Sequence, residues 1–68
     1  MTEYRNNAQD AVYQRHADGR RSYWGRVAYD AQTDTWTVLE GAGGTETVHG
    51  TYQDKALALA AVRALLTR

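Results

Sequence analysis

The sequence predicts a small α+β domain in which an antiparallel sheet of three to four strands packs on one C-terminal helix. Three observations support this prediction. Residues 55–66, KALALAAVRALL, contain no glycine or proline and are rich in strong helix formers. Several short runs rich in Val, Thr, Tyr and Trp precede them, as is typical of strands. Turn-forming residues separate those runs, so neighbouring strands are expected to fold back on one another.

Length and composition describe one neutral domain. The 68 residues include eight Lys and Arg, eight Asp and Glu, two His and no Cys. We therefore expect no disulfide, metal site, cofactor or small-molecule substrate, and no tight non-specific binding of nucleic acid. No apolar run is long enough to span a membrane, and the N-terminus lacks an apolar signal region, so a cytoplasmic protein without membrane contact is expected. A chain this short buries little surface, which favours self-association.

The N-terminal part of the chain is expected to be an arm followed by a hairpin. Residues 1–10 are polar and are predicted to form a flexible arm, whereas 11–68 form the single sheet-and-helix domain. Residues 11–16 and 21–29 are predicted to pair as strands, because the Asp18-Gly19 turn lies between two runs that contain Val, Tyr and Trp.

Two further strands are predicted before the helix. A turn at 30–34, with two Asp residues that can bond their own backbone, precedes TWTVLE at 35–40, which alternates strictly. The sequence GAGG at 41–44 then leads into a strand at 45–52. A phosphate-binding loop would need a helix directly after its glycines, so GAGG is not expected to bind phosphate.

The helix is predicted to begin after Asp54, whose carboxylate can cap the first turn. One apolar stripe is expected to pack on the sheet: Ala58, Leu59, Val62, Leu65 and Leu66. A second, solvent-side strip is also apolar: Leu57, Ala60, Ala61 and Ala64. This strip has two interpretations. Its residues are simply good helix formers, or they form an interface with a second copy or another protein.

Strict alternation along the strands assigns side chains to two sheet faces. The more apolar set is assigned to the helix side: Tyr23, Val27, Tyr29, Trp36, Val38, Val48 and Tyr52. On the opposite, Thr-rich face, a recognition surface is predicted: Trp24, Arg26, Thr37 and His49. If this face binds DNA, Arg20 and Arg21 at the hairpin tip are expected to contact phosphates.

Catalysis is not expected. The candidate nucleophile is Ser22, with His16 or His49 as its base, and no feature of the sequence brings these residues together. Asp30 and Asp34 lie in a turn, where such residues usually stabilise the turn itself.

Part of the chain resembles two families of small domains. The segment Gly50-Thr51-Tyr52, followed by an Ala-rich helix with Ala58 and Ala61, resembles the DNA-binding domains of plant ethylene-response factors and of phage integrase N-termini. Those domains have a three-stranded sheet and one helix, and this resemblance implies DNA binding by the sheet face. The order of Tyr29-Asp30, Trp36-Thr37-Val38 and Gly50 before an Ala/Leu helix resembles HicB antitoxins, which implies binding to another protein.

The sequence therefore predicts a small, non-enzymatic protein-interaction module, antitoxin-like or a phage-type accessory or inhibitor protein. A protein partner, a homodimer or both are expected. The alternative is a DNA-binding module of the integrase N-terminal type that uses its sheet face. The solvent-side strip of the helix and the open sheet face are the two candidate contact surfaces.

Overall fold

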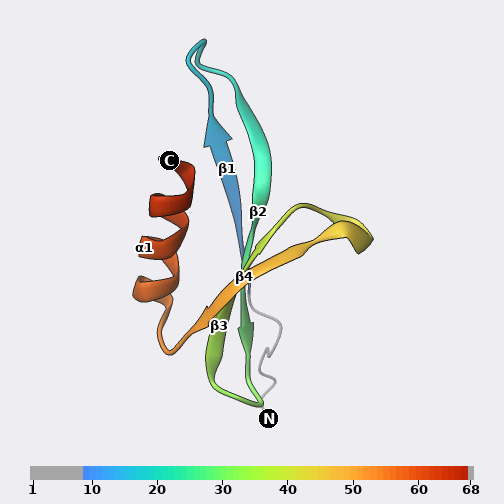
Figure 1. Cartoon of the computed structure of the whole chain (residues 1–68), viewed down its shortest axis with the longest axis vertical. Helices are drawn as coiled ribbons and strands as arrows, with labels where there is room; N and C mark the ends of the chain where they lie inside the picture. The colour runs from blue at the N-terminus through green and yellow to red at the C-terminus, as the bar shows by residue number, and fades with distance from the viewer. Residues whose placement is uncertain (1–8, 68) are drawn as a thin grey trace.

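The computed structural model describes residues 9–67, and within them four strands are followed by one α-helix. In chain order the elements are β1 (Gln9–Arg15), β2 (Arg21–Asp30), β3 (Thr35–Glu40), the 3-10 turn η1 (Gly43–Thr45), β4 (Thr47–Tyr52) and α1 (Lys55–Leu66). Each strand pairs antiparallel with the next, so the sheet order is β1-β2-β3-β4. Helix α1 lies on one face of this open sheet (Figure 1), which confirms the predicted α+β fold class.

The predicted element boundaries need correction at both ends of β1, at the end of β2 and at the start of β4. Strand β1 ends at Arg15 instead of residue 16, and β2 extends one residue further than predicted, to Asp30. Strand β1 begins at Gln9, so the last two residues of the predicted arm belong to the sheet, and the rest of that arm lies outside the described residues. Strand β4 begins at Thr47, because the preceding residues form η1, where the Thr45 hydroxyl donates to the backbone carbonyl of Ala42 at 2.9 Å. The strand at 35–40 and the helix at 55–66 are confirmed.

In both predicted turns, an Asp carboxylate accepts a backbone hydrogen bond and one residue has a positive φ. In the β1–β2 hairpin, Gly19 has a φ of 89°, and the Asp18 carboxylate accepts a bond from the backbone N–H of Arg20 at 3.0 Å. Asp34 has a φ of 56° in the β2–β3 turn, where the Asp30 carboxylate accepts a bond from the backbone two residues on. These local interactions hold neighbouring strands antiparallel. The first hairpin extends beyond α1, as Figure 1 shows.

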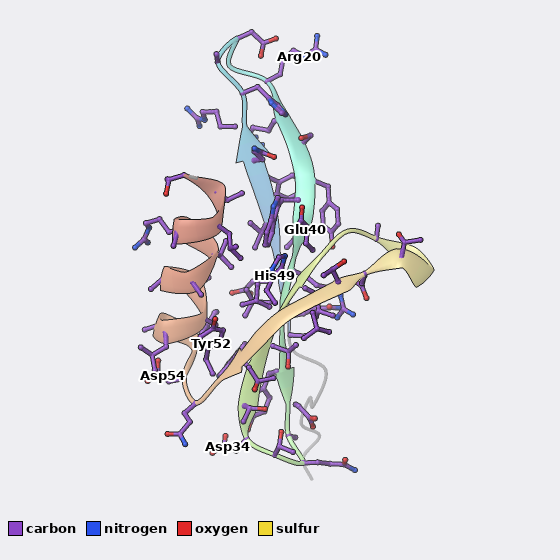
Figure 2. All side chains as sticks on the ribbon, viewed as in Figure 1. Arg20, Asp34, Glu40, His49, Tyr52 and Asp54 are labelled. Atoms are coloured by element: carbon purple, nitrogen blue, oxygen red, sulfur yellow. The ribbon has the colours of Figure 1, made fainter. Side chains whose placement is uncertain are left out.

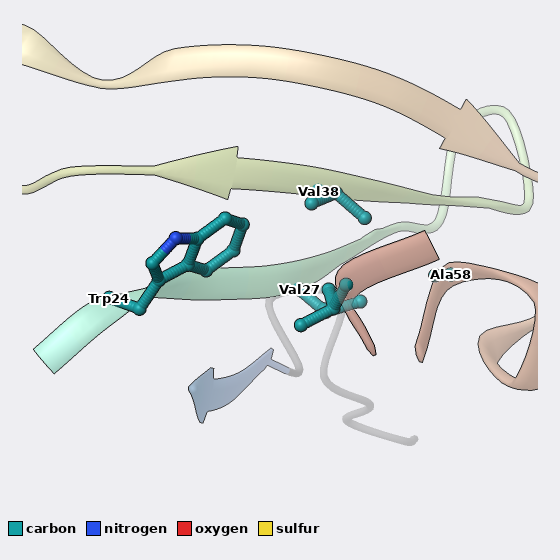
Figure 3. Packing of buried hydrophobic residues seen from close by; sticks show 5 residues of the cluster. Trp24, Val27, Val38 and Ala58 are labelled. Carbon is teal, nitrogen blue, oxygen red and sulfur yellow. The ribbon is translucent and has the colours of Figure 1, made fainter. Parts of the chain in front are cut away.

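Helix α1 begins at the predicted cap. The Asp54 carboxylate accepts a hydrogen bond from the backbone N–H of Leu57 at 2.9 Å, which satisfies one of the free amides of the first turn. The helix packs mainly on β3 and β4. The buried core consists of Trp24, Val27, Val38, Ala58 and Val62 (Figure 3). Leu59, Leu65 and Leu66 pack against it, which confirms the predicted core stripe of the helix.

A β-bulge in β2 changes which side chains face the helix. Val12 of β1 lies opposite Gly25, and the next residue, Tyr13, lies opposite Tyr23. Trp24 is therefore an extra residue without its own partner in β1. An extra residue breaks the two-residue alternation, so side chains before and after it do not follow one pattern.

A second bulge interrupts β4. Val38 lies opposite Gly50, and the next residue, Leu39, lies opposite Val48, so His49 is the extra residue. The His49 ring stacks on the indole of Trp24, with ring centroids 5.8 Å apart and an angle of 18° between the planes. The two bulged residues therefore lie together across the sheet, on the side of the core.

The bulges contradict part of the predicted face assignment. Trp24 and His49, predicted on the face opposite the helix, lie on the helix side. Tyr23 and Val48, predicted on the helix side, have 43% and 60% of their surface exposed. Strict alternation was the wrong assumption at these two places, because each bulge adds one residue and shifts the pattern by one.

Candidate functional site

A groove between β4 and α1 is the best candidate for a contact surface. It encloses a volume of about 350 Å³ and is lined by His49, Tyr52, Ala61, Ala64 and Leu65. Apart from the His49 imidazole, no lining side chain can carry a charge near neutral pH. Strand β4 is an edge strand, so its outer backbone groups have no partner strand among the described residues. The site therefore combines a mostly apolar groove with a free strand edge.

Part of the predicted solvent-side strip of α1 lines one wall of this groove. Ala61 and Ala64 line it, and Leu57 lies on the same line of the helix one turn earlier. Leu57 is 53% exposed, and Ala60 is exposed on the outer surface of the helix. The four residues thus lie outside the buried core, as predicted. Tyr52 and Leu65, which sequence reasoning placed only in the core, also reach the groove.

Glu40 holds the His49 imidazole over Trp24. A Glu40 carboxylate oxygen lies 2.8 Å from His49 Nε2, and both residues come from neighbouring strands (Figure 2). His49 therefore has a hydrogen-bond partner on one side and an aromatic ring below it, which fixes its orientation at the end of the groove. The alternating pattern of the strands gave no signal for this contact, because the His49 bulge creates it.

The four residues of the predicted recognition surface do not lie on one face. Trp24 and His49 face the helix, whereas Arg26 and Thr37 face the open side of the sheet. Trp24 is 9% exposed and belongs to the core, so little of its ring is available to a partner. The open face thus loses the predicted aromatic contact.

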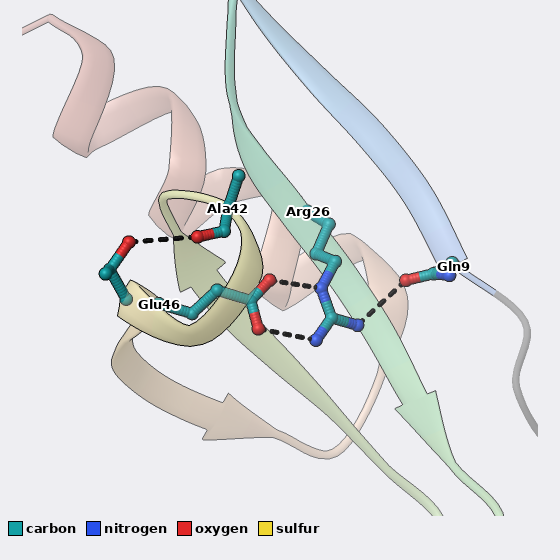
Figure 4. A network of polar contacts seen from close by, with 5 residues as sticks. Gln9, Arg26, Ala42 and Glu46 are labelled. Carbon is teal, nitrogen blue, oxygen red and sulfur yellow. Dashed lines mark hydrogen bonds and ion pairs between the residues drawn. The ribbon is translucent and has the colours of Figure 1, made fainter.

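The Arg26 guanidinium is engaged within the chain. Its Nε and Nη2 donate to the two carboxylate oxygens of Glu46 at 2.6 and 2.8 Å, and its Nη1 donates to the side-chain carbonyl of Gln9 at 2.8 Å (Figure 4). These bonds raise the pKa of Arg26 above its ordinary value. They also lower the pKa of Glu46 below its ordinary 4.5, mainly through the hydrogen bonds, while partial desolvation opposes this shift and the opposite charge of Arg26 adds to it. The network joins β1, β2 and the residue between η1 and β4.

Replacing Glu46 with glutamine should reduce the acid sensitivity of the fold. Because the pKa of Glu46 is lowered in the folded chain, the ion pair stabilises the fold above pH 4.5, and this stabilisation is lost as the pH falls through the lower folded-state pKa. Glu46→Gln should therefore be less stable than the parent near neutral pH, and the difference should shrink in acid. Urea unfolding at several pH values measures this. Asp18→Asn is the control, because it removes the charge from an exposed ion pair in which Arg20 Nε lies 3.7 Å from the Asp18 carboxylate. Its stability should differ little from that of the parent at any pH. If the difference in stability between Glu46→Gln and the parent does not change with pH, the lowered pKa of Glu46 is contradicted.

The hairpin tip carries the predicted phosphate contacts. Arg20 lies there (Figure 2), 3.7 Å from the Asp18 carboxylate, and Arg21 lies 5.6 Å from the ring centre of Tyr13. All of these side chains are exposed. The tip is therefore accessible, and Figure 2 shows Arg20 well apart from the groove residues His49 and Tyr52.

The structure brings Ser22 and His16 together, which the sequence did not predict. His16 Nε2 lies 2.7 Å from Ser22 Oγ across the first hairpin. Both residues are exposed, and the described contacts of His16 include no carboxylate that could orient its ring. Nucleophilic catalysis normally uses such an orienting group and a sheltered site. The pair therefore matches an exposed cross-strand hydrogen bond.

Two further kinds of feature are absent from the described residues. Within residues 9–67, no group of three or more His, Asp or Glu side chains is placed to hold a metal ion. The helix of the described chain is neither long nor apolar enough to cross a membrane.

Comparisons with known proteins add no family to these observations. The chain matches no known protein family, and no curated protein or solved structure is significantly similar to it.

Proposed function

We propose that this chain is a non-enzymatic interaction module that binds another protein chain through the groove between β4 and α1. The observation that supports this proposal is the combination of an uncharged groove wall, Ala61 and Ala64, with the free edge of β4. A strand edge offers backbone hydrogen bonds to a partner, and an apolar groove beside it offers burial. HicB-like antitoxins and phage-type accessory or inhibitor proteins would act by such contact, and the sequence resemblance supports that class.

DNA binding by the sheet face has less support. Arg26, the cation of the predicted recognition surface, is engaged by Glu46 and Gln9, and Trp24 belongs to the core. Arg20 and Arg21 remain at the tip, where they would supply phosphate contacts without base contacts. Such binding would be weak and would fall steeply with salt.

A photo-crosslinking amino acid in place of Ala64 tests the proposal. The groove should bring this position next to a partner, so irradiation of cells should give protein adducts that survive nuclease treatment. The control places the same amino acid at Ala56, which is exposed and points roughly 80–140° away from the Leu57, Ala61 and Ala64 line of the helix. It should give few adducts.

Three results would contradict the proposal: no adduct at position 64, equal adducts at both positions, or adducts that nuclease removes. The last result would favour nucleic-acid binding instead. Substituting Arg20 and Arg21 should then abolish those adducts, because both side chains are exposed at the hairpin tip and are the predicted phosphate contacts.

A further inference from the structure

The two edges of the sheet differ in their protection against pairing with another strand. Edge strands are usually protected from such pairing by charges, prolines or bulges. Strand β1 carries Asp10 and Arg15. Strand β4, TVHGTY, has no Lys, Arg, Asp, Glu or Pro, and its bulge at His49 leaves the stretch from Gly50 to Tyr52 in regular register with β3. The β4 edge, in its regular stretch from Gly50 to Tyr52, is therefore the edge that is open to another strand.

We infer that the occupant of the groove is a second copy of this chain, bound with β4 against β4 about a two-fold axis. This inference rests on the proposed function, because it names the partner of the same groove. Two copies related in this way form one continuous antiparallel sheet, with both α1 helices on the same face. The same patch serves both copies, so the assembly closes without leaving a sticky surface.

The position of α1 fits this arrangement. Strands in a sheet lie about 4.8 Å apart, so β4 lies roughly 2.4 Å and β3 roughly 7 Å from the two-fold axis. Because α1 packs mainly on β3 and β4, the two helix axes would lie roughly 10–14 Å apart. Helices in direct contact lie about 8–10 Å apart, so side chains must fill a shallow space between them. That space corresponds to the observed groove.

The helix strip can fill this space because it is complementary to itself. The two-fold axis makes the helices antiparallel. With the axis beside the middle of the strip, between Ala60 and Ala61, Leu57 of one copy lies opposite Ala64 of the other. Leu57 is a large side chain with 53% of its surface exposed, whereas Ala61 and Ala64 are small and line the groove. A large side chain thus meets small ones at both ends of the interface, which favours close packing.

The charges and the size of the core also favour a second copy. The chain has a net charge of zero, and neither β4 nor the strip contains an acidic or strongly basic residue, so two copies meet without like-charge repulsion. Val27 and Val38 are the largest fully buried side chains of the described structure. A core this small stabilises a domain weakly, and association of two copies buries further apolar surface.

Sedimentation of the purified chain across a range of concentrations tests the inference. The parent and Ala56→Glu should both sediment as dimers, because Ala56 lies outside the strip. Leu57→Glu/Ala64→Glu should weaken dimerisation at least 100-fold, since it places carboxylates opposite one another across the axis. Circular dichroism of each variant confirms that the fold remains, as expected because both substituted positions are exposed. A parent that stays monomeric at millimolar concentration overturns the inference.

A charge-exchange variant tests the orientation of the two helices. In Leu57→Lys/Ala64→Glu, each Lys lies opposite a Glu of the other copy, whereas the two positions within one helix are roughly 10 Å apart and cannot pair. The dimerisation affinity of this variant should be at least 10-fold higher than that of Leu57→Glu/Ala64→Glu. If the affinity is not recovered, the antiparallel arrangement is overturned.

The crosslinking experiment at position 64 tests the same inference independently. An adduct of twice the chain mass supports the inference. An adduct with a different protein alone overturns the inference but leaves the proposed function intact.

Discussion

Gly25→Ala is expected to unfold the sheet. Gly25 is buried beside the β2 bulge, and a Cβ atom added there would lie 2.1 Å from the backbone carbonyl oxygen of Leu39 and 2.9 Å from Cα of Glu40. Both neighbours are backbone atoms, so relief requires β2 and β3 to separate. We expect a loss of about 3 kcal/mol or more, which is a large part of the roughly 3–10 kcal/mol of a domain of this size.

The matched control for this prediction is Gly44→Ala. A Cβ at Gly44 meets no atom within 4 Å, and its backbone does not adopt a positive φ. Its stability should therefore change by about 0.5 kcal/mol or less. Thermal and urea unfolding compare the two variants. Equal midpoints would show that β2 and β3 do not approach as closely as described.

Trp36→Ala is expected to cost about 3–5 kcal/mol. Trp36 packs against the core from β3, its ring centroid lies 5.0 Å from that of Tyr29, and Lys55 Nζ lies 5.5 Å from its ring centre. Truncation removes these contacts and leaves a cavity under the start of α1. The variant should lose the cooperative unfolding transition near room temperature, or show it at a much lower urea concentration.

Tyr23→Ala is the control for Trp36→Ala. Strict alternation places both rings on the helix side, but the bulge at Trp24 moves Tyr23 to the open face, where it is 43% exposed. Tyr23 contacts Tyr13 edge to face, with centroids 5.9 Å apart, so its loss should cost about 1 kcal/mol. Equal losses for the two variants would contradict the face assignment of the structure.

Local sequence signals predicted the elements well. Asp54 gave the start of α1, Asp18-Gly19 gave the first hairpin, and the alternation of 35–40 gave β3. Each of these signals depends on neighbours a few residues away, so the sequence contains the whole interaction. The predicted boundaries were wrong at both ends of β1, at the end of β2 and at the start of β4. Pairing with the next strand, and not local propensity, decides where a strand begins or ends.

The candidate site was predicted in part. The helical period placed Leu57, Ala61 and Ala64 on one line away from the core, and two of them line the groove. The opposite wall was missed, because His49 was assigned to the other face of the sheet. Glu46 was also missed as the partner of Arg26, since these residues lie 20 positions apart and meet only when β4 folds against the sheet.

The sequence by itself determined the α+β class, the order of strands and helix, and the apolar strip of α1. These properties follow from periodicity and turn chemistry, which act over a few residues. The tertiary structure alone decided the two bulges, and with them the faces of Trp24 and His49. A bulge depends on the register between paired strands, and one extra residue reverses the faces on either side of it. Because Gly25 lets β2 approach β3 closely while Trp24 stacks on His49, the core and the groove take their shape from contacts between strands.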